Sequence, residues 1–213
     1  MTLAEKITQA REDIDAAYAA GEAKGNEDGY KRGQLSTINM LLNDRKIAIP
    51  EGITALPIYC FLGYRKLEKV SLPSTLKKIE GAAFQECKAL NNIEIPENVT
   101  SIGNFAFYQC FAFTEMVFPE KVTAIGAVVL AECTGLIRFV AKGKVESIAE
   151  RAFDRCSNCI SYDFSCCDSV PSLGINAFRD INAQAEIIVP DSLLSQWKTQ
   201  WASLASHIRA KSE

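Results

Sequence analysis

The stretch NNIEIPENVTSIGNFAFYQC, Asn91 to Cys110, contains the pattern that decides the fold. Its first part alternates Ile93 and Ile95 with Glu94, which is the periodicity of a β-strand, and the proline that follows ends a strand. VTSIG predicts a second short extended piece, and NFAFYQC predicts a tight or 3₁₀-like segment that turns the chain back. The stretch therefore predicts one coil built from two short strands and a turn.

The same pattern recurs every 23 residues along most of the chain. The strand-ending pairs are Ile49-Pro50, Leu72-Pro73, Ile95-Pro96 and Phe118-Pro119. A phenylalanine column is formed by Phe61, Phe84, Phe107, Leu130 and Phe153, and a cysteine column by Cys87, Cys110, Cys133 and Cys156. Five units run from Ile47 to Ser161, a sixth starts at Tyr162 with two extra residues, and IIVP at 187–190 begins a seventh. Such a repeat predicts a solenoid, because stacked units can bury apolar columns that one unit cannot.

The flanks of the repeat carry helical patterns, which suits the need of a solenoid for covered terminal coils. After the last strand, Asp191 or Ser192 is placed to N-cap a helix that reaches Arg209. The apolar face of this helix would be Leu193, Trp197, Trp201, Leu204 and Ile208. We expect it to cap the last coil, and a helix that binds a partner is the alternative.

The N-terminal flank allows more than one interpretation. Apolar residues in 3–17 are spaced as in a coiled coil, but for barely two heptads. Glycines at 21, 25, 29 and 33 fit either a hinge or a close-packed oligomer helix, and the P-loop pattern GK[ST] is absent. A second short helix is predicted at 30–43, leading into the first coil.

The repeat unit I-x-I-P-x-x-V-T-x-I-G-x-x-A-F-x-x-C-x-x-L resembles the BspA-type leucine-rich repeat, also called the Treponema pallidum type, over residues 47–190. The resemblance, with the two flanks, predicts an α+β repeat solenoid: a leucine-rich repeat right-handed superhelix with 23-residue coils and helical caps at both ends. The predicted regions are an N-terminal helical segment and cap at 1–46, a solenoid of about six to seven coils at 47–190, and a C-terminal capping helix at 191–213. The better-known members of this family are bacterial surface adhesins, so the resemblance implies a binding function.

Composition argues against several other function classes. The 213 residues include 23 basic and 26 acidic ones, and no basic block could follow the phosphates of a nucleic acid. The longest run of small apolar residues, AVVLA at 127–131, is too short to cross a bilayer, so we expect no membrane insertion. The chain shows no signal peptide and reads as cytoplasmic as written, whereas the family is often found at the cell surface.

The residues that could carry chemistry are few. The only histidine is His207, which leaves no multi-histidine metal site and no Ser-His-Asp arrangement, so we predict no enzyme activity, no catalytic residue and no cofactor. Cys156 and Cys159 have the spacing of a zinc pair and are followed by Cys166 and Cys167. The repeat already places the first two in core columns, but a zinc site, a disulfide and free thiols all stay open for the four. In the repeat, Cys110 should behave as a small hydrophobe whose weak S–H donor can reach a turn carbonyl.

The outward side of the strands is the predicted binding surface. The outward column runs Ala48, Ser71, Glu94, Val117, Val140 and Asp163. The candidate partner-binding residues are Glu94, Val117, Ile137, Arg138, Val140, Ile160 and Asp163. Four of them are aliphatic and predict an exposed apolar patch, which usually marks a contact site. The alternatives are that a cap or an oligomer partner covers the patch, or that it is ordinary β-branched surface.

Two functions follow from these observations. We predict a non-enzymatic interaction or adhesion module that binds a protein or a surface polysaccharide. The alternative is a structural assembly subunit of an appendage or phage-like particle, a homo-oligomer formed through residues 1–33.

Overall fold

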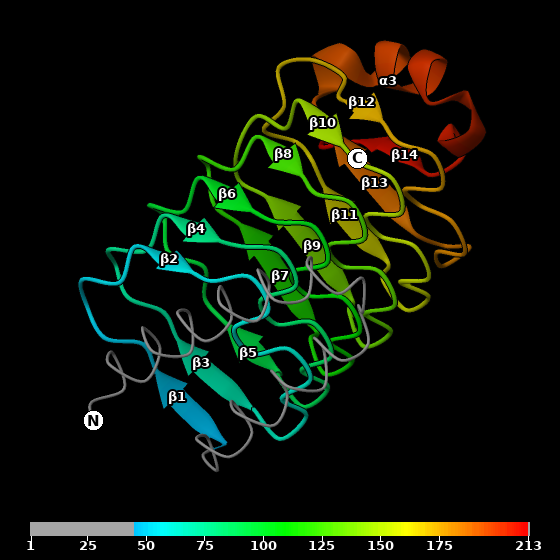
Figure 1. The fold of residues 1–213 in the computed structure, drawn as a ribbon. Helices are drawn as coiled ribbons and strands as arrows, with labels where there is room; N and C mark the ends of the chain where they lie inside the picture. The colour runs from blue at the N-terminus through cyan, green and yellow to red at the C-terminus, as the bar shows by residue number, and fades with distance from the viewer. Residues whose placement is uncertain (1–44, 213) are drawn as a thin grey trace, which may run out of the picture.

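The computed structural model describes residues 45–212, which form a stack of parallel coils (Figure 1). The predicted N-terminal helices and the proposed oligomer segment 1–33 lie outside the described residues. Parallel strands line two sides of the stack, and a turn segment forms the third side. The predicted repeat solenoid is confirmed as a parallel-strand β-solenoid of about 7 turns with about 23 residues each. The superhelix, the helical caps and the three region boundaries stay predictions.

Each coil contributes one strand to each strand-lined side. The first side contains β1 (Lys46–Ala48), β3 (Lys69–Ser71), β5 (Asn92–Ile93), β7 (Glu115–Phe118), β9 (Arg138–Ala141), β11 (Ser161–Asp163) and β13 (Glu186–Val189). The second side contains β2 (Ala55–Leu56), β4 (Lys78–Ile79), β6 (Ser101–Ile102), β8 (Ala124–Ile125), β10 (Ser147–Ile148) and β12 (Ser172–Leu173). The register follows the repeat, since Ile47 pairs with Val70, and the two extra residues of the sixth unit lie between the paired Tyr162 and Ile187.

The core is built from the columns that the sequence repeats. Phe61, Phe84 and Phe107 are buried and stacked, with ring centroids 5.2 and 5.5 Å apart. The cysteine column lies beside them. The Cys110 thiol donates to the Phe84 carbonyl oxygen of the preceding coil at 3.1 Å. The thiols of Cys87, Cys133 and Cys156 each donate to the equivalent carbonyl oxygen of their own preceding coil. The predicted thiol-to-carbonyl contact is therefore confirmed.

The turn side reverses the chain through residues in the left-handed region. In the third coil these are Phe105, with φ of 60°, and Gln109, with φ of 58°. The corresponding residues of the other coils are Tyr59 and Gly63, Ala82 and Glu86, Val128 and Glu132, Arg151 and Arg155, Asn176 and Asp180. Gly103 lies just before this turn segment. A Cβ there would lie 2.5 Å from the backbone nitrogen of Gly81, so the glycine allows two coils to approach.

The C-terminal segment differs from the predicted helix over 191–209. It consists of η1 (Asp191–Leu193), α3 (Leu194–Gln200), η2 (Ala202–Leu204) and β14 (Ile208–Ala210). No side-chain hydrogen bond caps α3, which stops at Trp201 with φ of −105° and ψ of 51°. The chain then returns to extended geometry because β14 pairs with β13, Ile208 facing Ile187, and so satisfies the free side of that strand. Trp201 packs on Phe178 with ring centroids 5.7 Å apart.

Both strand ladders are interrupted at the same junction. On the first side, β1, β3 and β5 form one sheet, and β7, β9, β11, β13 and β14 form another. On the second side, β2, β4 and β6 form one sheet, and β8, β10 and β12 form another. Only the turn side continues, with the Phe105 and Phe107 N–H groups bonded to the carbonyl oxygens of Ala127 and Val129 at 2.9 Å.

The size of the inward side chains changes at this junction. β5 and the residues after it turn Ile93 and Ile95 inward, whereas β7 turns in Met116 and Phe118. Met116 and Phe118 are buried, while Ile93 and Ile95 are only partly buried. We attribute the break to this difference in side-chain size. In a close-packed interior, larger inward side chains require a larger distance between neighbouring strands.

Candidate functional site

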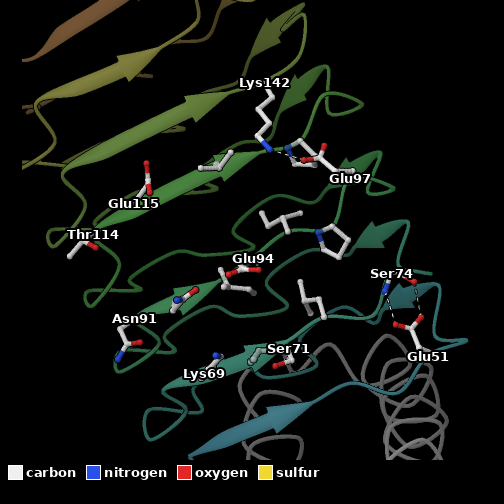
Figure 2. A pocket seen from close by; sticks show the side chains of 18 residues that line it. Glu51, Lys69, Ser71, Ser74, Asn91, Glu94, Glu97, Thr114, Glu115 and Lys142 are labelled. Atoms are coloured by element: carbon white, nitrogen blue, oxygen red, sulfur yellow. Dashed lines mark hydrogen bonds and ion pairs between the residues drawn. The ribbon is translucent and has the colours of Figure 1, made fainter.

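A groove of about 890 Å³ lies on the first strand side at the interrupted junction (Figure 2). We call it the central groove. Its floor is the strand segment 91–97, and its walls come from residues of β3 and β7. Inward residues such as Ile93 and outward residues such as Glu94 both line it. The groove therefore exposes the strand backbone itself as well as side chains.

The polar side chains of the central groove divide into paired and unpaired ones. Lys142 donates to Glu97 at 2.7 Å, from a coil two turns away. The Glu51 carboxylate accepts hydrogen bonds from the backbone N–H and the hydroxyl of Ser74, both at 3.0 Å, and the backbone bond is the main reason that the pKa of Glu51 is lowered. The side chains of Lys69 and Glu94 make no hydrogen bond or ion pair with another residue of 45–212, so they are available to a ligand.

A charged row crosses the strands next to the groove. Arg138 on β9 lies 3.6 Å from Glu115 on β7 and 3.9 Å from Asp163 on β11. The parallel register places Glu115 directly beside Arg138, whereas Asp163 pairs with Val140 and therefore reaches Arg138 diagonally. Because the side chains of Arg138 and Glu115 are about half exposed, their ion pair contributes little to stability, whereas the side chain of Asp163 is only 19% exposed.

The candidate residues from the sequence fall into two groups. Glu94 and Val117 line the central groove, and the other five lie outside it. Ile137 and Ile160 are 46% and 49% exposed, whereas Val117 and Val140 are half-buried. Arg138 is the first residue of β9 and lies between Ile137 and Val140 in the sequence. The charged row therefore separates the exposed pair, Ile137 and Ile160, from the half-buried pair, Val117 and Val140. The role of all seven in binding stays a prediction.

Sequence reasoning missed much of the groove lining. Lys69, Asn91, Thr114 and Lys142 all line it, but none belongs to the outward column that we selected. The signal that could have located the groove is the change from isoleucine to methionine and phenylalanine in the inward positions. That change predicts a break in the ladder, and a break exposes the residues on both sides of it.

The residues considered for metal or catalytic chemistry have structural contacts. The Cys156 and Cys159 thiols donate to different acceptors, the carbonyl oxygens of Leu130 at 3.1 Å and Ser161 at 3.4 Å. All eight cysteines are free thiols, and of these only Cys166 is exposed. His207 lies just before β14 rather than on a helix, with its Nδ1 2.8 Å from the carbonyl oxygen of Ala185. Across residues 45–212, no cluster of three or more His, Cys, Asp or Glu side chains is arranged to hold a metal ion. The helical part of the same range contains no segment long and apolar enough to cross a membrane.

Comparison with known proteins agrees with this fold. The family model described as BspA type Leucine rich repeat region matches residues 40–160 and 146–198, in 6 copies. Among solved structures, the chain is similar to a leucine-rich repeat protein of T. pallidum, with a TM-score of 0.60 and 23% identity over 77% of this chain and 72% of that one.

Two further solved structures are similar over part of their length. A leucine-rich repeat protein from Bacteroides ovatus has a TM-score of 0.50 and 24% identity over 69% of this chain, and one from Eubacterium ventriosum has a TM-score of 0.52 and 23% identity over 65%. The match spans 43% of each of those two proteins. No curated protein matches the sequence. At these identities the structural likeness establishes the fold alone.

Proposed function

The chain belongs to the BspA-type leucine-rich repeat family, and from this premise we propose that it is a non-enzymatic interaction module of the adhesion type. The partner is a protein that binds through the central groove and the adjoining charged row. Adhesion would place the molecule at a cell surface, and that location is part of the proposal.

The observation that carries the proposal is the central groove with its two unpaired charges. Surface lysines and glutamates usually extend into water, but Lys69 and Glu94 line an 890 Å³ depression together with backbone groups. A ligand in the groove would meet a cation, an anion and hydrogen-bonding groups at fixed positions. Such complementarity gives specificity and faster association.

A protein partner is favoured over a surface polysaccharide by the charge of the lining. Glu94 is complementary to a positively charged group and Lys69 to a negatively charged one. A polypeptide supplies both kinds of group through its side chains. The assembly alternative depends on residues 1–33, and nothing in 45–212 favours it. It stays a prediction from the sequence.

The first experiment compares two charge reversals of the same kind. Glu94→Lys changes the groove, whereas Glu80→Lys changes an exposed residue outside it. Each full-length variant is used to capture proteins from extracellular-matrix and bacterial-surface extracts. We expect one or more proteins to be retained by the wild type and by Glu80→Lys and to be lost with Glu94→Lys, at unchanged thermal unfolding.

A second pair of variants tests the aliphatic residues of the strand face. Val117→Thr combined with Val140→Thr keeps the β-branched shape of two half-buried residues that pair in register, so it should leave thermal unfolding nearly unchanged and weaken capture of the same protein. Equal capture by all variants would contradict the proposed binding face, and loss of folding in the double variant would assign the two valines to the core. Capture that survives proteolysis of the extract but not glycosidase treatment would replace the protein partner with a polysaccharide.

A further inference from the structure

We propose that the interrupted junction is a slot for one extended segment of the partner protein, which enters as an additional parallel or antiparallel strand between β5 and β7. The segment carries a basic residue next to Glu94. This inference rests on the proposed binding function and specifies how the partner would be recognised.

The first argument comes from the backbone of the two strands. In a parallel ladder, alternate residues bond to opposite neighbours. In the first coil the inward Ile49 bonds to the following coil, its N–H donating to the Ser71 carbonyl oxygen at 2.9 Å. The equivalent N–H of Ile95 has no backbone partner, and no backbone hydrogen bond joins β5 to β7 within residues 45–212.

The β7 side of the junction is open in the same way. The Ile137 N–H bonds to the Thr114 carbonyl oxygen at 2.8 Å, but the Thr114 N–H has no corresponding bond to Asn91. β5 and β7 therefore face each other with rows of free donors and acceptors. One inserted strand would satisfy both rows at once, which is the interaction of β-augmentation.

The spacing of these free groups selects a polypeptide. Main-chain donors and acceptors along a strand repeat every two residues, at about 3.3 Å per residue, and a second extended polypeptide has the same repeat. A sugar chain presents hydroxyl groups without this alternation. The polypeptide is therefore the occupant that matches both open strands.

The side chains of the slot define the chemistry of the segment. Ile93 and Ile95 are only partly buried, whereas the residues at the same inward positions in the first and fourth coils are buried. They offer apolar surface to alternate side chains of an inserted strand. The ionisable lining consists of Glu51, Glu94, Glu97, Glu115, Lys69 and Lys142, which gives a net charge of −2. Lys142 is bonded to Glu97, and Arg138 lies 3.6 Å from Glu115, so Glu51, Glu94 and Lys69 remain; their acidic excess of one favours a basic residue in the ligand.

The junction is held by contacts that the slot does not use. The turn side keeps its hydrogen bonds from Phe105 and Phe107, and the Lys142–Glu97 ion pair connects the third coil to the fifth across the gap. A strand could thus bind without separating the two halves of the solenoid.

Hydrogen exchange of the full-length chain tests the open junction without any ligand. The amides of Ile95 and Thr114 should exchange as fast as those of exposed loops, while their matched counterparts Ile49 and Ile137 exchange slowly. Equal protection of all four amides would overturn the slot. It would leave the proposed binding face intact, because side chains alone could still carry partner binding.

The occupant is tested with a short capped peptide of alternating lysine and valine. It should bind and protect the Ile95 and Thr114 amides, and the same peptide with alternate backbone nitrogens methylated should do neither. Glu94→Gln should weaken binding about two- to fivefold, as expected for one solvated ion pair, and Glu80→Gln should leave it unchanged.

Several results would refute an extended segment of a partner protein as the occupant. These are equal binding of the methylated peptide, protection of the two amides by a neutral oligosaccharide instead of the peptide, and protection that increases with protein concentration alone. The last result would assign the slot to a second copy of the chain.

Discussion

Two adjacent valines should respond in opposite ways to the same substitution. Val128 occupies the left-handed region with φ of 58° and is half-buried, whereas Val129 is fully buried and does not have a positive φ. A β-branched residue is poorly suited to positive φ. The corresponding residue two coils later is Asn176, also with φ of 58°, and asparagine tolerates that conformation. We therefore compare Val128→Gly with Val129→Gly.

The magnitudes follow from conformation and burial. Glycine at 128 removes a left-handed penalty of about 1–2 kcal/mol. Against this stand about 0.5–1 kcal/mol for the flexibility of glycine and about 1 kcal/mol for the burial of half a valine. These contributions nearly cancel, so stability should change by less than about 1 kcal/mol in either direction. At Val129 there is no strain to relieve, and the loss of full burial together with the glycine cost gives about 2–4 kcal/mol of destabilisation.

Urea unfolding of the two full-length variants, followed by far-ultraviolet circular dichroism, measures both values. The reasoning requires Val129→Gly to lower the free energy of unfolding clearly more than Val128→Gly. Equal losses would show that the positive φ of the turn column carries no strain. A third variant, Val128→Asn, keeps a side chain and should also remain close to wild-type stability.

The remaining predictions concern the core columns. Phe107→Ala should lower the free energy of unfolding by about 3–5 kcal/mol because it empties a fully buried site. Cys110→Ala should lower it by about 1 kcal/mol, the contribution of one hydrogen bond. Urea unfolding measures both values, and equal losses would contradict a packing role for the phenylalanine column. In the native protein only Cys166 should react rapidly with a thiol reagent, as mass spectrometry of the labelled chain would show; rapid labelling of the column thiols would mean that the coils open. Burial raises the pKa of Cys60 and Cys133 from 9.0 to about 12, so the folded chain keeps protons that the unfolded chain loses. The contribution of these thiols to stability should be constant below about pH 9 and then fall by about 1.4 kcal/mol per buried thiol for each pH unit up to about pH 12. Urea midpoints measured across this range should decline less steeply for Cys133→Ala, and a flat profile would contradict the burial of the thiols.

The sequence predicted those parts of the fold that depend on periodicity. Ile47 and Val70 pair across one coil because each stands at the same place in the repeat, and the two added residues of the sixth unit shift the next pairing as expected. The thiol of Cys110 meets the Phe84 carbonyl oxygen for the same reason. In these cases every coil has the same local geometry because the sequence repeats. A correct prediction for one coil therefore holds for the others.

Features that depend on differences between coils could not be predicted in this way. The C-terminal segment has helical spacing from Leu193 onwards, but the free side of β13 is satisfied by a strand, so Ile208 joins the sheet. Tertiary hydrogen bonding overrides local periodicity there. The central groove arises from Met116 and Phe118, whose bulk acts on the spacing of coils rather than on the pattern within one. Selecting the outward residue of each strand therefore identified Glu94 and Val117. It did not identify the groove lining that comes from the backbone and from neighbouring coils.

The interrupted ladders also have a consequence for the cooperativity of unfolding. In a solenoid, stability is approximately the sum of the intrinsic term of each repeat and the coupling between nearest neighbours. Coupling between the third and fourth coils lacks the hydrogen bonds of both strand sides, so it is the weakest in the stack. The coils before and after the junction then behave as two foldons. Denaturant should melt the block of three coils before the junction first, while the larger block after it, with more neighbour contacts, keeps its structure.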